Sequence, residues 1–222
     1  SEIIMEPLEI YHIYSSRQER QKRVEELMDT VGLARRLANA YPHELDGGRR
    51  QRIGVARALA LNPKFIVCDE PVSALDVSIQ AQILNLMQDL QDQHGLAYMF
   101  ITHDLSVVKH ISDDILVMYL GKMVEKCQAK ELFRNHLHPY TNALLSAIPV
   151  PEIGAAKNRV LLQGELSSPI NPKPGCRFAN RCRHACEKCF EEDPALQEVL
   201  PGHFVACHQI ERIKEEREMR NE

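Results

Sequence analysis

The spacing of apolar residues along the chain predicts an alternation of helices and strands. Helices are expected over residues 17–39 and 48–61, and a strongly amphipathic one over residues 77–93. Two short apolar runs, "KFIVCDEP" and "GLAYMFITHD", are typical of buried strands. With a further strand downstream, this order predicts parallel pairing with right-handed crossovers, which is an α/β fold.

Shorter elements are expected after the second strand. "SVVKHIS" predicts a short helix, and "DDILVMYLGKMVEK" predicts a strand pair that turns at Gly121 and Lys122. Helices follow over roughly 129–135 and 139–148. Residues 149–175 are rich in proline, glycine and serine and predict a linker or a meandering loop.

Composition narrows the class of protein only slightly. The chain has 222 residues, 44% of them hydrophobic and 26% charged, which suits one globular domain with a smaller appendage. The net charge of -4 gives no basic field for nucleic acid. No apolar run approaches the length of a membrane span, and "SEIIMEPLEI" has no signal-peptide pattern. The cytosol is therefore the expected compartment.

Polar side chains follow both apolar strands. Asp69 and Glu70 end the first strand, and His103 ends the second. Because the carboxyl ends of parallel strands face the ligand crevice, these side chains are expected at one edge of the sheet. There an Asp can hold Mg²⁺, a Glu can position or deprotonate an attacking water, and a His can hydrogen-bond a phosphate oxygen. The plain alternative is that they only cap the strand ends.

The stretch "LDGGRRQRIGVARALA", residues 45–60, adds a second candidate for phosphate binding. Two glycines open an arginine-rich helix, and a helix N-terminus attracts anions. Taken with the Asp-Glu strand, "SALD" and His103, it resembles the ATP-binding subunits of ABC transporters. Four further stretches, "EPVSALDVSIQAQ", "ISDDILVMYLGKMVE", "LHPYTNALLSAIPVP" and "SPINPKPGCRF", are similar to the oligopeptide/dipeptide (and nickel) permease ATPases. The resemblance covers nearly the whole chain.

The resemblance implies a role for each candidate residue. Glu70 would be the catalytic carboxylate, Asp69 the Mg²⁺ partner and His103 the sensor of the γ-phosphate. Ser73 and Asp76 would lie at a dimer interface. Backbone N–H groups of Gly47 and Gly48 would reach the γ-phosphate held by the opposite subunit.

The same resemblance implies a domain plan. Residues 1–148 would form a partial P-loop NTPase domain, with a helical subdomain over about 1–62 and a core over about 63–127. Residues 149–222 would be a linker and a cysteine-rich extension. Two such subunits would bind ATP and energise a membrane permease that imports peptides, or nickel, delivered by an extracytoplasmic solute-binding protein. The chain would then sit on the inner face of the cell membrane.

Two departures from the family pattern bear on activity. The family has Ser where this chain has Asp46, and Gln where it has Arg49. An ionised carboxylate cannot donate to phosphate, and two like charges 4 Å apart repel by roughly 4 kcal/mol at an effective dielectric of 20. Arg49 could offset part of this repulsion. The alternative is structural: Asp46 caps the helix as well as Ser would.

The second departure is that the printed sequence contains no GxxxxGK[ST] loop. The sequence therefore resembles the C-terminal two-thirds of such an ATPase. We expect the chain alone to bind ATP poorly and its sheet to expose apolar surface. A truncated, non-catalytic remnant that serves as a dimerisation or metal-cluster module is the alternative function.

Cysteines crowd the last quarter of the chain. Cys176, Cys182, Cys189 and Cys207 follow a C-x5-C-x6-C-x17-C pattern, and Cys186 is an extra thiol that could compete as a ligand. Four cytosolic thiolates can bind zinc or an iron–sulfur cluster, and spacing alone does not choose. The resemblance implies a [4Fe–4S] cluster with a structural role. Unliganded thiols remain the alternative.

Overall fold

The computed structural model describes residues 1–148, 160–165, 168 and 170–221. Within them the chain forms two compact units, residues 1–104 (unit 1) and 105–222 (unit 2). The domain boundary predicted after residue 148 differs from this division and stays a prediction. Much of the predicted linker, residues 149–159, lies outside the described part. No helix in the described part is both long and apolar enough to cross a membrane.

Unit 1 begins with a helical layer: α1 (Glu2–Ile10), α2 (Arg17–Thr30) and α3 (Gly47–Leu59), with single 3₁₀ turns at Arg35–Leu37 and Pro42–Glu44. A capping box between Ser16 and Glu19 starts α2. The expected helix over 17–39 was too long, because the chain turns at Gly32 with a φ of 69°. The sequence reasoning also missed α1.

Apolar side chains of the three helices form the core of unit 1. Leu8, Val24 and Val31 are fully buried, and Ala56 of α3 packs with them. Leu90 and Leu96 extend this core toward the strands. Burial of these side chains, rather than helix propensity, holds the short helices in place.

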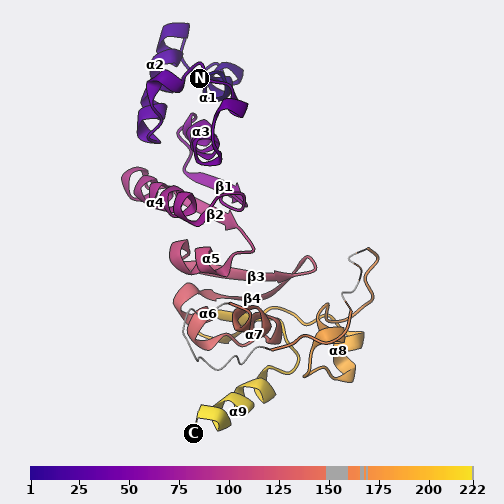
Figure 1. Ribbon diagram of the computed structural model, residues 1–222. Coiled ribbons are helices and arrows are strands. Elements are labelled where there is room, and N and C mark those ends of the chain that lie inside the picture. The colour runs from indigo at the N-terminus through magenta and orange to yellow at the C-terminus, as the bar shows by residue number, and fades with distance from the viewer. Residues whose placement is uncertain (149–159, 166–167, 169, 222) are drawn as a thin grey trace. The chain divides into compact units, whose positions relative to one another are not determined.

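The parallel strand pair of unit 1 follows the helices (Figure 1). β1 (Phe65–Asp69) pairs with β2 (Ala97–Ile101), in register from Phe65–Ala97 to Asp69–Ile101. The crossover is α4 (Val77–His94), which Asp76 caps and which ends at Gly95 with a φ of 63°. The predicted strand–helix–strand unit is confirmed.

One face of this sheet is open, which corrects the expectation of buried strands. Phe65 and Val67 of β1 are 51% and 56% exposed, and Met99 and Ile101 of β2 are 51% and 46% exposed. Alternate residues such as Ile66 and Tyr98 pack against the core instead. The expected apolar surface is therefore present on β1 and β2.

Unit 2 contains a four-stranded antiparallel sheet in the order β3-β4-β6-β5. Its strands are β3 (Asp114–Tyr119), β4 (Lys122–Gln128), β5 (Gln197–Leu200) and β6 (His203–Val205). The third strand was expected beside the parallel pair, but it pairs with β4 in a hairpin. The hairpin turns at Leu120 and Gly121, both with positive φ, one residue earlier than predicted.

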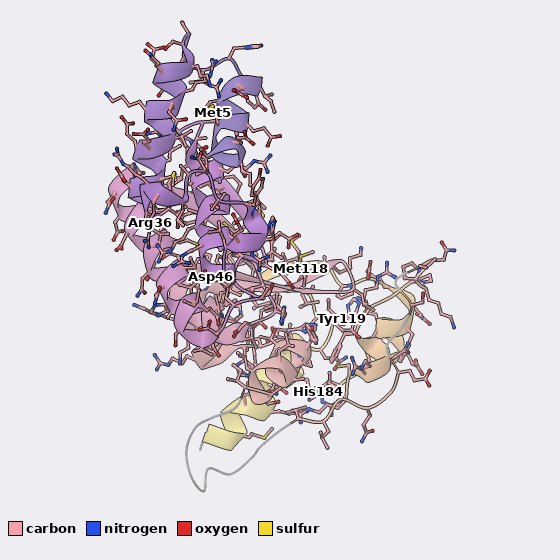
Figure 2. The ribbon with its side chains drawn as sticks, turned by 45° about the horizontal axis from the view of Figure 1, so that its top comes forward. Met5, Arg36, Asp46, Met118, Tyr119 and His184 are labelled. Atoms are coloured by element: carbon pink, nitrogen blue, oxygen red, sulfur yellow. The ribbon has the colours of Figure 1, made fainter. Side chains whose placement is uncertain are left out.

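The described part of unit 2 also contains several helices. They are α5 (Leu105–Ile111), α6 (Ala129–Asn135), α7 (Pro139–Ser146), α8 (Glu187–Glu191) and α9 (Ile210–Asn221), with a 3₁₀ turn at Ala179–Arg181. The predicted short helix and the two helices after the hairpin are confirmed within two residues. On β3, Tyr119 is buried while its neighbour Met118 is 54% exposed (Figure 2). That alternation defines the core side of the hairpin.

The cysteine-rich segment shares the core of unit 2. Phe178 is 1% exposed and packs edge-on against Tyr119, with ring centroids 5.2 Å apart. Cys176 and Cys182 line the same cluster. β6 adds to the sheet through pairs between Glu125 and Val205 and between Lys126 and Phe204. The described part of the segment is therefore built into unit 2.

Candidate functional site

The carboxyl edge of the parallel pair brings two predicted residues together. The Glu70 N–H donates to the Ile101 carbonyl at 2.9 Å, which extends the ladder by one residue. Across the edge, His103 Nδ1 lies 2.9 Å from Glu70 Oε1. The predicted convergence of the Asp-Glu pair and the histidine at one sheet edge is confirmed by this contact.

The Glu70 side chain is held in an exposed and ionised state. Its backbone turns with a φ of 45°, and its side chain is 47% exposed, against 75% for His103. The hydrogen bond with His103 lowers the pKa of Glu70 below its usual value. Ser73 Oγ donates to the Glu70 carbonyl at 3.1 Å and steadies the turn. An ionised carboxylate open to solvent can accept a proton from water.

Asp69 lies beside this pair as the last residue of β1, and it is exposed. An exposed carboxylate suits Mg²⁺, which keeps several waters and needs few protein ligands. Asp69 is the residue that would hold the ion, whose chemistry is to neutralise phosphate charge.

Asp46 acts as the N-cap of α3. Its Oδ1 accepts a hydrogen bond from the Arg49 N–H at 2.8 Å, and its Oδ2 lies 3.2 Å from Arg49 Nη1. Both possibilities raised from the sequence are therefore present, the cap and the pairing with Arg49. Figure 2 marks Asp46 on the helical part of unit 1.

The two glycines after Asp46 let α3 approach the start of α4. A Cβ added at Gly48 would lie 2.6 Å from Ile79 Cγ2, and one at Gly47 would lie 3.0 Å from Leu75 Cδ2. Asp76 caps α4 by accepting from the Ser78 and Ile79 N–H groups at 3.1 and 3.0 Å. The small size of Gly48 thus has a packing reason as well as the predicted phosphate role.

The predicted cluster cysteines lie near one another but do not form a ligand set. Burial and three neighbouring thiols raise the pKa of Cys207 to about 12; these neighbours are Cys182, Cys176 and Cys189. The sulfurs of Cys186 and Cys189 lie 3.6 Å apart, and Gln209 Nε2 donates to Cys186 Sγ at 3.0 Å. Across the described residues, no three Cys, His, Asp or Glu side chains are grouped to hold a metal. The donor type suits iron or zinc, whereas the arrangement does not.

Sequence reasoning missed a buried carboxylate in unit 2. Glu125 has no exposed surface, and it accepts from the Leu137 and His138 N–H groups at 2.5 and 3.1 Å. His203 Nε2 lies 2.7 Å from its Oε1. Burial raises the pKa of Glu125, but hydrogen bonds led by that from His203 outweigh it and leave the pKa lowered. The available signal was a glutamate that directly follows Val124 in a predicted strand.

Two histidines, His136 and His138, lie near this carboxylate. His138 is 1% exposed, and its Nδ1 accepts from the Tyr140 N–H at 3.1 Å, which caps α7. Burial lowers the pKa of His138 to about 4. His136 is paired with Asn142 at 3.3 Å. His138 is thus held in the packing of unit 2.

Comparisons with known proteins match two stretches of the chain to family models. The family model "ABC transporter" matches residues 3–73, and the model "Oligopeptide/dipeptide transporter, C-terminal region" matches residues 124–189. CbiO1 of Clostridium perfringens, part of the ABC transporter complex CbiONQ, is 26% identical with a TM-score of 0.52, covering 60% of this chain and 51% of its own. The chain belongs to the ATP-binding proteins of ABC transporters.

Its relatives place it in a particular branch of that family. The oligopeptide transport ATP-binding protein AppF of Bacillus subtilis is 57% identical over 93% of this chain and 63% of its own length. OppF of Escherichia coli, of the same description, is 55% identical over 96% of this chain and 64% of its own. The chain is an oligopeptide/dipeptide-type member of the family, and it spans less than two thirds of these relatives.

Proposed function

We propose that the chain is part of an ATP-hydrolysing subunit that energises a peptide importer. The single observation that carries this proposal is the 2.9 Å contact between Glu70 and His103 at the carboxyl edge of a parallel strand pair. A general base and a phosphate-sensing histidine are needed at one place for hydrolysis. The relatives named for oligopeptide transport support peptides as the solute.

Each residue has a role in this proposal. Glu70 accepts the proton of the attacking water, and His103 orients Glu70 and contacts the γ-phosphate. Asp69 holds Mg²⁺ through water. Gly47 and Gly48 present N–H groups to the nucleotide of a second subunit, and Ser73 and Asp76 lie at that dimer interface.

Partners and location follow from the same proposal. A second ATP-binding subunit, identical or related, completes the ATP sites. Closure of the two ATP-binding subunits drives two transmembrane permease subunits. An extracytoplasmic solute-binding protein delivers the solute to that permease. The chain then works at the inner face of the cell membrane. No nucleic acid is involved, in keeping with the net charge of -4.

For the cysteine-rich segment we propose a [4Fe–4S] cluster on Cys176, Cys182, Cys189 and Cys207, with zinc as the less favoured occupant. The proximity of these four thiols within unit 2 supports the proposal. The sulfurs would have to rearrange to bind it. Iron and acid-labile sulfide in the anaerobically purified protein are expected near four atoms of each per chain, as the cluster type requires. Metal-free protein would count against the cluster and leave the ATPase proposal untouched.

The first test of the function is the intact mass of the protein in its source cells, followed by its ATPase activity. A mass well above 25.4 kDa is expected, because the printed sequence holds no phosphate-binding GxxxxGK[ST] loop. In that protein, Glu70→Gln should lower hydrolysis about a hundredfold or more while ATP binding remains. Unchanged hydrolysis in the Glu70→Gln protein would overturn the catalytic assignment.

A non-catalytic dimerisation or metal-cluster module is the second candidate. The observation that favours it is the negative charge of Asp46, which lies at the start of α3 as its N-cap. A native mass equal to 25.4 kDa, with tight ATP binding absent, would favour this candidate.

A further inference from the structure

A basic pocket in unit 2 is used by none of the roles proposed above. It lies between α5 and α6, encloses about 500 Å³, and is called here the α5–α6 pocket. Its lining residues are Lys109, His110, Ser112, Ala129, Lys130, Phe133 and Arg134. That volume falls in the range of small-molecule sites and exceeds what a single bound ion needs.

The charges around this pocket have one sign. No acidic residue lines it. Within the described part of the chain, Lys109, Lys130 and Arg134 form no ion pair. The nearby carboxylates Asp114 and Glu131 act on the buried Cys127, whose pKa they help to raise, and Glu131 accepts from Asn135. Three cations therefore line one pocket without an ion-pair partner among the described residues, and an anion would lower their mutual repulsion.

The frame of the pocket is fixed by backbone contacts. The Ser112 N–H donates to the Val108 carbonyl at 3.1 Å and closes α5, while the Ala129 N–H donates to the Asp113 carbonyl at 2.8 Å. The second bond ties the start of α6 to the residue after Ser112. Lys109 lies over the Phe133 ring at 5.6 Å, so its ammonium group is held at the pocket.

The positions of the cations need an explanation beyond helix stability. Lys109 and His110 sit in the last turn of α5, where a positive charge is favourable. Lys130, however, is the second residue of α6, where the helix dipole disfavours a cation. An anion bound beside the Lys130 ammonium group would offset that cost.

We propose that the α5–α6 pocket binds a phosphate-bearing anion through Lys109, Lys130 and Arg134, with the Ser112 hydroxyl as a further donor. Arg offers paired N–H groups to phosphate oxygens, and Lys supplies point charges. The phosphate can belong to a soluble ester or to a lipid headgroup, and the chemistry of recognition is shared. The proposal is independent of the ATPase proposal, since it uses none of its residues.

The test uses pyrophosphate as the probe and calorimetry on the 222-residue protein. Saturable binding is expected, weakened about tenfold or more in Lys130→Gln/Arg134→Gln, because two charged hydrogen bonds are lost. The control, Lys173→Gln/Lys188→Gln, removes two charges from exposed positions outside the lining and should bind as the parent does. Ser112→Ala should weaken binding by a smaller factor.

Vesicles provide the second arm. Cosedimentation is measured with phosphatidylglycerol vesicles and, for comparison, with phosphatidylcholine vesicles. If Lys130→Gln/Arg134→Gln weakens only the vesicle binding, the phosphate belongs to a lipid. If the same variant weakens only the binding of pyrophosphate, the phosphate belongs to a soluble ester. Equal binding by the parent and Lys130→Gln/Arg134→Gln in both arms, or no binding by the parent in either arm, overturns the proposal.

Discussion

Asp46 caps α3 at a position where the proposed function would place a phosphate donor. Its two carboxylate oxygens engage the N–H and the guanidinium of Arg49 at 2.8 and 3.2 Å, so α3 keeps a full cap. The same charge stands where the family's serine would donate to phosphate. Folding and phosphate binding can therefore be separated at this residue.

Substitutions at Asp46 test that separation. Asp46→Ser should leave the free energy of unfolding nearly unchanged, because both residues cap well, whereas Asp46→Ala should cost about 1 kcal/mol. In the full-length protein, Asp46→Ser should raise ATP hydrolysis most, because it removes the charge and adds a donor, whereas Asp46→Ala removes only the charge and should raise it less. Urea unfolding and a phosphate-release assay measure the two effects. Equal hydrolysis in the parent and Asp46→Ser would mean that the aspartate does not repel nucleotide.

His138 makes the stability of unit 2 depend on pH. Its pKa is lowered from 6.5 to about 4 by burial, so the unfolded chain binds more protons between these values. Stability should therefore fall as the pH drops from 6.5 to 4, by on the order of 3 kcal/mol. Hydrogen exchange of unit 2 peptides across this range measures the loss.

The matched variant is His138→Asn, which keeps a capping acceptor for the Tyr140 N–H but does not titrate in this range. It should lower stability at pH 7 because it leaves a cavity, and it should flatten the slope between pH 6.5 and 4. A slope as steep as that of the parent would assign the pH dependence to another group.

At the scale of elements, the positions of helices and strands were more predictable than which strands pair in a sheet. The period of apolar residues located α3, α4, β1 and β2, because each has one core-facing side. The edge with Glu70 and His103 followed from strand order alone. The hairpin of β3 and β4 was also predicted, but its place in a separate antiparallel sheet was not, since a short apolar run does not specify its neighbouring strand.

The helix pair α3–α4 offers a matched test with two glycines on one helix. Gly48→Ala should cost about 1–3 kcal/mol, because its methyl group would lie 2.6 Å from Ile79 Cγ2. Gly54→Ala meets nothing within 4 Å and should stabilise the helix by up to about 1 kcal/mol. Thermal unfolding distinguishes them. If both variants behave alike, the close approach of α3 to α4 is not tight.

At the scale of the whole chain, the long-range contacts were the least predictable. Glu125 and His203 lie 78 residues apart, and nothing in either local pattern points to the other. The four cysteines were found by their spacing, but the way they lie depends on the entire packing of unit 2. Exposed apolar surface on the sheet was expected, although the two apolar runs themselves had been predicted to be buried strands.

That open face predicts the solution behaviour of the 222-residue chain. Contiguous exposed apolar side chains promote association, so the chain should self-associate and bind a hydrophobic dye. Val67→Thr/Met99→Thr should reduce both effects while keeping strand propensity. Sedimentation velocity and dye fluorescence measure them. The control is Leu161→Thr, since Leu161 is 77% exposed but belongs to no strand. Equal effects of the two variants would contradict a role for the sheet face.

The Glu125–His203 contact has a practical consequence for anyone who exchanges C-terminal segments between members of this family. β6 completes the sheet of unit 2, and His203 supplies the partner of a carboxylate that has no exposed surface. A chimera that brings a foreign tail without a histidine at this position removes one hydrogen-bond partner of a buried carboxylate, at a cost of about 1–3 kcal/mol. Grafts should therefore carry the glutamate and the histidine together, as one inherited unit.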